Sequence, residues 1–160
     1  MRHNFKLPKT THTCGPFSIQ ACLKEDGINR EEDTIKKICH TTKKEGTNER
    51  DMVKACKYFG YVVKSGEIVS TSRFVNRIIK GLEVNHRFIV ASEAGNHWFA
   101  VLRYYKRRRL FKIVDGDYYQ IVKKSVLQYI KLHQLLKTSF NYDKFTDKEY
   151  YYFLELSREE

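Results

Sequence analysis

The chain has 160 residues, and 41% of them are hydrophobic and 14% aromatic. This composition excludes a disordered chain and predicts one globular domain over residues 1–160. The formal net charge of +11 at pH 7 favours an acidic partner, such as nucleic acid, an anionic membrane surface or an acidic protein, but it carries no information about the fold. No stretch approaches membrane-spanning length and the first residues lack an export signal, so we expect a cytoplasmic protein without a membrane span.

The first half of the sequence has the apolar spacing of helices. Gly15 and Pro16 begin the first helix, and Gly27 ends it. Asn29 has the spacing of a capping box with Glu32, which predicts that a second helix begins there. The further helices expected span 49–59 and 71–81, with short β runs at 61–64 and 67–69 between them.

The second half has the alternation and the turn residues of strands. The predicted strands are 87–91, 97–105, 110–114 and 118–122, and the short turns between them predict an antiparallel meander. The run from Trp98 to Leu102 is apolar on both faces, so we expect a layer of structure on each side of that strand. The remaining elements expected are a helix at 124–137, a loop at 138–148 and a final edge strand at 150–154.

Cys14 is the candidate nucleophile because it lies where the first helix begins. Free backbone amides and the positive end of the helix dipole favour a thiolate there, and the thiolate is the reactive form. The alternative is a small buried residue that only starts the helix. The other three cysteines fall on apolar stripes of predicted helices without Cys-x-x-Cys spacing, so we interpret Cys22, Cys39 and Cys56 as reduced core residues.

His97 and Asp115 are the candidate base and its partner. If the hairpin turns at residues 105–107, the two residues lie opposite each other on one face of the sheet. A carboxylate fixes the tautomer of an imidazole, and if the Cys14 helix packs on the same face, the other ring nitrogen can accept the thiol proton. The spacing therefore predicts a Cys-His-Asp triad, with a purely structural histidine as the alternative.

Several motifs follow one another along the chain: Thr13-Cys14-Gly15-Pro16, Gly46-Thr47, Gly60-Tyr61, His97-Trp98-Phe99-Ala100-Val101-Leu102 and Val114-Asp115-Gly116-Asp117. In this order they resemble the papain-like cysteine peptidases of the bacteriocin-processing, double-glycine leader type and their stand-alone relatives. The resemblance spans residues 7–117 and implies an α+β, papain-like fold, with a helical half packed on an antiparallel sheet. It also implies a thiol hydrolase that cleaves a peptide or protein substrate without a cofactor, with Cys14 as nucleophile, His97 as base and Asp115 as the residue that orients it.

The sequence departs from the pattern of that family at the oxyanion position. The family usually has a glutamine five or six residues before the nucleophile, where this chain has Lys9 and Pro8. Loss of such a donor typically lowers the rate by ~10²–10³-fold. We therefore hypothesise that Lys9 supplies the missing donor. The alternative is a catalytically inactive papain-like binding module that uses its basic surface on nucleic acid or an acidic protein.

Two further patterns bear on partners and metals. Residues 103–112 contain six basic side chains and two tyrosines, a composition suited to phosphate contacts and base stacking, with a solvated hairpin tip as the alternative. The candidate binding residues are Arg107, Arg108 and Arg109. His12 could join Cys14 and His97 around a metal, but no matching second pair of ligands is visible, so we expect no metal site.

Overall fold

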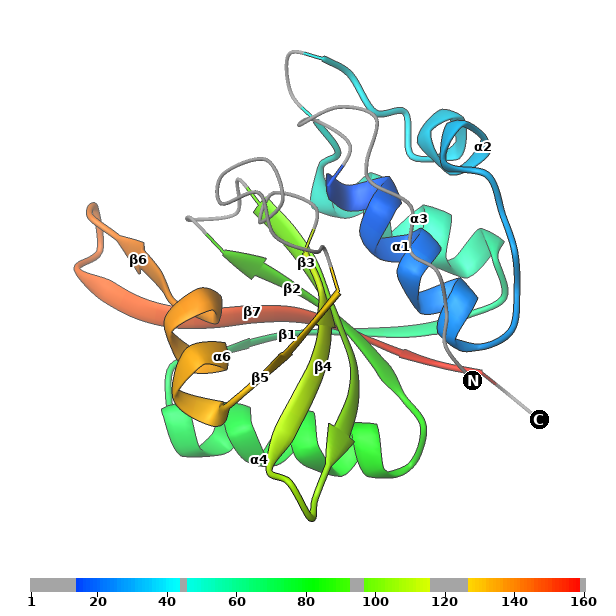
Figure 1. The fold of residues 1–160 in the computed structure, drawn as a ribbon. Helices are drawn as coiled ribbons and strands as arrows, with labels where there is room; N and C mark the ends of the chain where they lie inside the picture. The colour runs from blue at the N-terminus through cyan, green and yellow to red at the C-terminus, as the bar shows by residue number, and fades with distance from the viewer. Residues whose placement is uncertain (1–13, 44–45, 93–96, 116–126, 159–160) are drawn as a thin grey trace.

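The computed structural model describes residues 14–43, 46–92, 97–115 and 127–158 (Figure 1). Its helices are α1 (Cys14–Glu25), α2 (Glu32–Ile38), α3 (Glu49–Tyr58), α4 (Thr71–Glu83) and α6 (Leu132–Ser139). Its strands are β1 (Val62–Ile68), β2 (Arg87–Ser92), β3 (His97–Tyr105), β4 (Leu110–Val114), β5 (Leu127–Ile130), β6 (Asn141–Asp143) and β7 (Lys148–Ser157). The chain is thus an α+β protein with a helix-rich first part, as its sequence predicts.

The strands form an antiparallel sheet in the order β1-β7-β2-β3-β4-β5, and β6 pairs with β7 outside this path. The meander from β2 to β4 is confirmed. The prediction of a final edge strand at 150–154 is wrong, because β7 lies between β1 and β2 and is bonded on both sides. The tyrosines of β7 therefore stand inside the sheet.

Helices cover both faces of the sheet (Figure 1). On one face, α1 packs over Trp98, Ala100 and Leu102 of β3, and α3 packs next to it against β1. On the other face, α4 and α6 pack over a cluster that includes Phe99 and Val101. The side chains from Trp98 to Leu102 are all buried, so the prediction of a strand covered on each side is confirmed.

The structure differs from the predicted elements at three further places. Residues 127–130 form strand β5 along β4, and helix α6 begins only at Leu132, so the helix predicted at 124–137 is wrong. The loop predicted at 138–148 contains β6. Helix α2 has Glu31 rather than Asn29 as its N-cap, without a side-chain hydrogen bond. The strand predicted at 118–122 lies outside the described residues.

Among the helices that the structure describes, none is long and apolar enough to cross a membrane.

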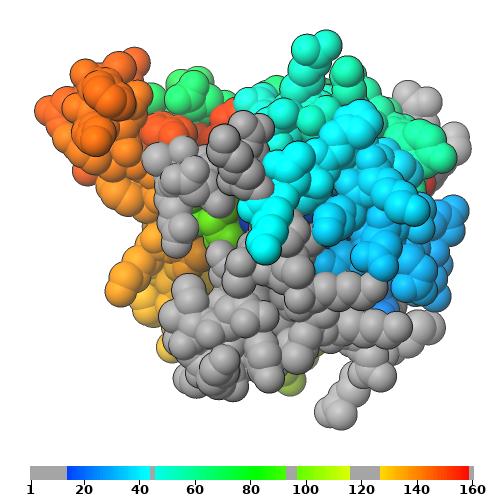
Figure 2. Space-filling view, turned by 90° about the horizontal axis from the view of Figure 1, so that it is seen from above, coloured from blue at the N-terminus to red at the C-terminus, as the bar shows by residue number. Residues whose placement is uncertain are grey.

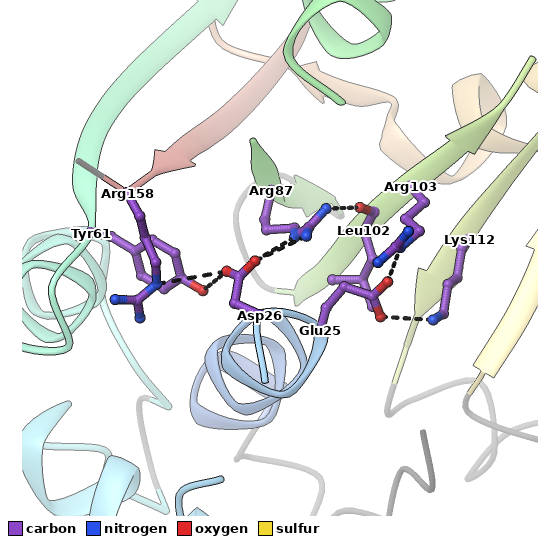
Figure 3. A network of polar contacts seen from close by, with 8 residues as sticks. All are labelled: Glu25, Asp26, Tyr61, Arg87, Leu102, Arg103, Lys112 and Arg158. Atoms are coloured by element: carbon purple, nitrogen blue, oxygen red, sulfur yellow. Dashed lines mark hydrogen bonds and ion pairs between the residues drawn. The ribbon is translucent and has the colours of Figure 1, made fainter. Parts of the chain in front are cut away.

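The carboxyl end of α1 is held to the sheet by buried ion pairs (Figure 3). Lys112 Nζ lies 2.7 Å from Glu25 Oε2, and Arg103 pairs with the other oxygen of the same carboxylate. A β-bulge between Val101 and Arg103 shifts the register of β3 against β4, and it accompanies the turn of Arg103 toward α1. Because a carboxylate at the end of a helix opposes the helix dipole, these cations are what make the position of Glu25 favourable.

A second carboxylate extends the same network. Asp26 Oδ1 accepts a hydrogen bond of 2.9 Å from Arg87, and Asp26 Oδ2 accepts one of 2.5 Å from the Tyr61 hydroxyl. Arg87 also donates to the carbonyl oxygen of Leu102, which lies in β3 (Figure 3). One end of α1 is therefore fixed to β2 and β3, and this contact sets where the opposite end, with Cys14, lies.

Candidate active site

Cys14 is the first residue of α1 and is half-buried. The Ser18 hydroxyl donates a hydrogen bond of 2.7 Å to the Cys14 carbonyl oxygen, which anchors the first turn. The N–H groups of a first turn have no acceptor within their own helix, and Pro16 contributes none. The amides of Cys14 and Gly15 therefore belong to the positive end of the helix, beside the sulfur.

Gly15 permits a close approach between the start of α1 and the segment before α3. A Cβ added at Gly15 would lie 2.8 Å from Met52 Sδ and 3.0 Å from the Thr47 side chain. The Thr47 carbonyl oxygen in turn accepts a hydrogen bond of 3.2 Å from Trp98 Nε1. The residue after Cys14 is thus connected, through Thr47, to the residue after His97.

The candidate base and its partner are joined as the sequence predicts. His97 Nε2 lies 2.8 Å from Asp115 Oδ1, and both residues are buried, with exposed fractions of 4% and 6%. A carboxylate accepts the proton of Nε2–H, so this contact favours the neutral tautomer in which Nδ1 carries the lone pair. Burial strengthens the attraction between a charged imidazolium and Asp115, because the local dielectric constant is low.

The register that joins them differs from the predicted one. Ala100 lies opposite Val114, so Asp115 falls beside Phe99 rather than opposite His97. Residues two apart on a strand share one face, and a diagonal neighbour lies within reach of a long side chain. Asp115 therefore reaches His97 diagonally. The turn lies at residues 106–109, so the turn predicted at 105–107 is wrong by one to two positions.

His97 and helix α1 lie on different sides of β3. The His97 ring lies next to the Phe99 ring, with centroids 6.5 Å apart, whereas α1 covers the Trp98 side. Helix α1 therefore does not pack on the face of His97, which was the condition attached to the predicted triad. Because His97 is the first residue of β3, a sulfur at the start of α1 can approach its ring over the end of the strand.

The lengths of the two elements bring Cys14 to that end. From the pair between Glu25 and Arg103, the helix runs back to Cys14 over about 16 Å, at ~1.5 Å per residue. The strand runs back to His97 over about 20 Å, at ~3.3 Å per residue. Cys14 also packs against the core cluster that contains Trp98. In Figure 1 the start of α1, the start of β3 and the end of β4 all lie at the upper end of the molecule.

The other three cysteines are fully buried core residues. Burial raises the pKa of the Cys22 and Cys56 thiols far above the ordinary value. Burial, followed by the charge of Asp51, raises the pKa of Cys39 to about 12. These thiols remain protonated at neutral pH, which agrees with the prediction that they only fill the core.

The predicted basic hairpin separates into two parts. Arg103 and Lys112 pair with Glu25, and Lys112 is buried, so neither is available to a phosphate in the way that the sequence analysis assumes. Arg107, Arg108 and Arg109 are exposed in the turn between β3 and β4, at the lower end of Figure 1 and far from His97. The structure therefore does not bring these arginines to the candidate triad.

Two sequence hypotheses fall on residues that the structure does not describe. Lys9, the candidate oxyanion donor, and His12, the possible metal ligand, both lie outside the described residues. Within the described ranges, no group of three or more His, Cys, Asp or Glu side chains is placed to hold a metal ion.

Comparisons with known proteins show which fold this is. No family model and no curated protein sequence matches the chain. Among solved structures, the peptidase domain of Streptococcus ComA, a bifunctional ABC transporter of a quorum-sensing pathway, superposes with a TM-score of 0.62 at 17% identity, over 98% of this chain and 100% of that domain. A double-glycine motif protease from an AMS/PCAT transporter, solved with its leader peptide, gives a TM-score of 0.59 at 12% identity, over 93% and 89% of the two chains. The peptidase domain of Streptococcus mutans ComA gives 0.52 at 13% identity, over 97% and 99%.

Proposed function

We propose that this protein is a cysteine peptidase that acts through Cys14, His97 and Asp115. The observation that carries the proposal is the buried hydrogen bond of 2.8 Å between His97 and Asp115, at the end of the sheet near which α1 begins. The solved peptidase domains share the fold of this chain, which supports the same chemistry without establishing it. A peptide or protein substrate is supported by the leader peptide bound to one of these neighbours.

In the first half of the reaction, Cys14 Sγ attacks the carbonyl carbon of a peptide bond. His97 Nδ1 accepts the thiol proton, and the imidazolium is stabilised by Asp115 at Nε2. The S–C bond forms as the carbonyl π electrons move to oxygen. His97 then gives the proton to the leaving nitrogen, the C–N bond breaks, and an acyl thioester on Cys14 remains.

In the second half, His97 Nδ1 takes a proton from a water molecule, whose oxygen attacks the thioester carbonyl carbon. The C–S bond breaks, the sulfur takes the proton back from His97, and the carboxylic acid leaves. Asp115 acts only through His97 and is therefore a positioning residue. It keeps the ring in one orientation through both halves of the reaction.

The oxyanion needs donors beside Cys14 in both halves. The first-turn amides of α1 provide one of them, because the helix does not use those N–H groups itself. We assign the second to Lys9, which occupies the sequence position of the family's glutamine. An ammonium is a stronger donor than an amide, but its long flexible side chain costs more entropy to fix.

The test of this function is hydrolysis of internally quenched peptides by the wild type and by variants of Lys9. We expect hydrolysis that is absent in Cys14→Ala, a loss of ~10²-fold or more in Lys9→Ala, and retained or higher turnover in Lys9→Gln. If Lys9→Ala is as active as the wild type, another group stabilises the oxyanion. If the wild type and Cys14→Ala hydrolyse no peptide, the peptidase proposal is wrong.

A second candidate function is a catalytically inactive papain-like binding module. The observation that favours it is the absence of the oxyanion glutamine before Cys14. Its binding surface would be the exposed turn of Lys106 to Arg109, which keeps its positive charge after Arg103 and Lys112 are assigned to Glu25. Retention of nucleic acid on this turn at low salt, together with no hydrolysis of any peptide, is the result that distinguishes it from the peptidase.

A further inference from the structure

We propose that the cavity beside the start of α1 is a side-chain subsite that binds a lysine or arginine of the peptide substrate, next to the bond that Cys14 attacks. The proposal rests on the proposed function and deepens it, because it names the class of peptide that the enzyme selects. We call this cavity the acidic subsite. It is bounded by the segment before α3, by β3 and by the β6–β7 hairpin.

The acidic subsite includes the two residues that connect the start of α1 with the start of β3. Its volume is about 520 Å³, within the ~300–1,000 Å³ typical of small-molecule sites. Thr47 and Trp98 both line it. Thr47 is the residue that Gly15 approaches closely, and Trp98 directly follows His97. Figure 2, which views this end from above, shows cyan atoms of the segment before α3 next to green atoms of the central strands.

Aromatic rings make up the wall opposite α3. Tyr150 and Tyr152 of β7 line the cavity together with Trp98. The rings of Trp98 and Tyr152 meet edge to face, with centroids 6.1 Å apart and an interplanar angle of 66°. Aromatic faces attract cations through their quadrupole, and tryptophan does so most strongly. An alkyl chain that ends in a positive charge therefore matches this wall better than a carboxylate does.

Carboxylates line the rest of the cavity. Glu49 begins α3, Glu67 lies in β1, and Asp143 ends β6, so the charges come from three separate elements. Among the described residues that line the cavity, none is a lysine or an arginine. In a chain with a net charge of +11, this is a local reversal of sign. Burial first, and then the charges of Glu67 and Asp143, raise the pKa of Tyr150, so these carboxylates act on the cavity.

The carboxylates differ in how much of their charge is available. Asp143 Oδ1 accepts a hydrogen bond of 2.9 Å from the Phe145 amide, and Lys148 is its cross-strand partner. Glu49 and Glu67 are exposed residues at the cavity, where their carboxylates can be reached by a cationic side chain of the substrate. A metal ion is a poorer occupant, since the described residues offer no group of three ligands close enough to hold one.

The test uses the fluorescence of Trp98, which is the single tryptophan of the chain and lies in the cavity wall. Binding is measured with Cys14→Ala, so that the result does not depend on hydrolysis. The ligands are a blocked pentapeptide with one central lysine and the same peptide with norleucine, which keeps the alkyl chain and removes the charge. We expect saturable change of the Trp98 emission, with binding at least about fivefold tighter for the lysine peptide.

A second experiment removes negative charge from the cavity. The variant Glu49→Gln/Glu67→Gln should reduce the lysine preference to about twofold or less, because both exposed carboxylates are gone. The matched control is Glu83→Gln, at the exposed end of α4, which removes one charge elsewhere and should keep the preference. Circular dichroism checks that each variant is folded.

Equal affinity of the Cys14→Ala protein for the two peptides, or no change of Trp98 emission with either one, would show that the proposed subsite is wrong. Hydrolysis by the wild type, measured separately, shows whether the peptidase proposal stands or falls.

Discussion

Replacing His97 with alanine is expected to lower turnover by ~10⁴-fold, because the thiol loses its base and the leaving nitrogen loses its proton donor. The imidazole of His97 is the only group assigned to both proton transfers, and Asp115 holds it from 2.8 Å away in a buried setting. The measurement is kcat/KM for a quenched peptide substrate. Turnover of His97→Ala within about tenfold of the wild type would show that another residue transfers the proton.

Variants of Asp115 separate positioning from charge. Asp115→Asn keeps an oxygen that accepts from Nε2–H, as in peptidases with a Cys-His-Asn arrangement, so it should retain much more activity than Asp115→Ala. We expect a loss of ~10²-fold or more for Asp115→Ala and a smaller loss for Asp115→Asn. Equal losses in the two variants would mean that the hydrogen bond to His97 is not what Asp115 contributes.

Replacing Glu25 with glutamine is expected to destabilise the fold by about 3 kcal/mol, in the range found when one partner of a buried ion pair is removed. The Glu25 side chain is only 1% exposed and that of Lys112 6%, so the variant leaves the Lys112 ammonium buried without its carboxylate. Lys112→Met should cost less, because Glu25 still pairs with Arg103. Urea unfolding of both single variants and the double variant measures the coupling between them.

The contribution of Glu25 depends on pH in a defined direction. Burial alone would raise the pKa of the Glu25 carboxyl, but hydrogen bonds from Lys112 and Arg103 outweigh it and lower the pKa below its ordinary value. The stabilisation is therefore fully present above ~4.3, the ordinary pKa of glutamate, and is lost as the pH falls through the lowered value. The stability difference between the wild type and Glu25→Gln should be constant near neutral pH and shrink below about pH 4. Glu83→Gln, on the exposed end of α4, is the control and should change stability by less than ~0.5 kcal/mol.

Local sequence patterns were sufficient to predict most helices and the central strands. The N-cap of α3 at Asn48 and that of α4 at Ser70 each hold a hydrogen bond to a first-turn amide, which is why those helices begin where the sequence predicts. The run from Trp98 to Leu102 is apolar at every position, so a strand with a layer on each side was predictable from composition alone. The contact between His97 and Asp115 was predictable because a short hairpin joins their strands, although the exact register was not.

Features that depend on distant residues could not be predicted in this way. Residues 127–130 have apolar spacing that suits a helix, but they pair with β4 along an edge that only the folded sheet provides. The place of β7 between β1 and β2 follows from pairings between residues 61 to 95 positions apart in the sequence. The acidic subsite combines residues from the start of α3 and from five different strands. The bulge in β3 has no local signal that distinguishes it from a regular strand.

The assignment of Cys14 as the nucleophile is tested by alkylation with limiting iodoacetamide at pH 7, with the labelled cysteine identified by mass spectrometry. If Cys14 is the nucleophile that His97 activates, it should react faster than a free thiol such as glutathione. Burial keeps the thiols of Cys22, Cys39 and Cys56 protonated and out of reach, so they should be labelled only after unfolding. We expect that Cys14 alone is labelled and that His97→Ala slows this labelling. Labelling of Cys14 no faster than of glutathione would contradict its assignment as the nucleophile.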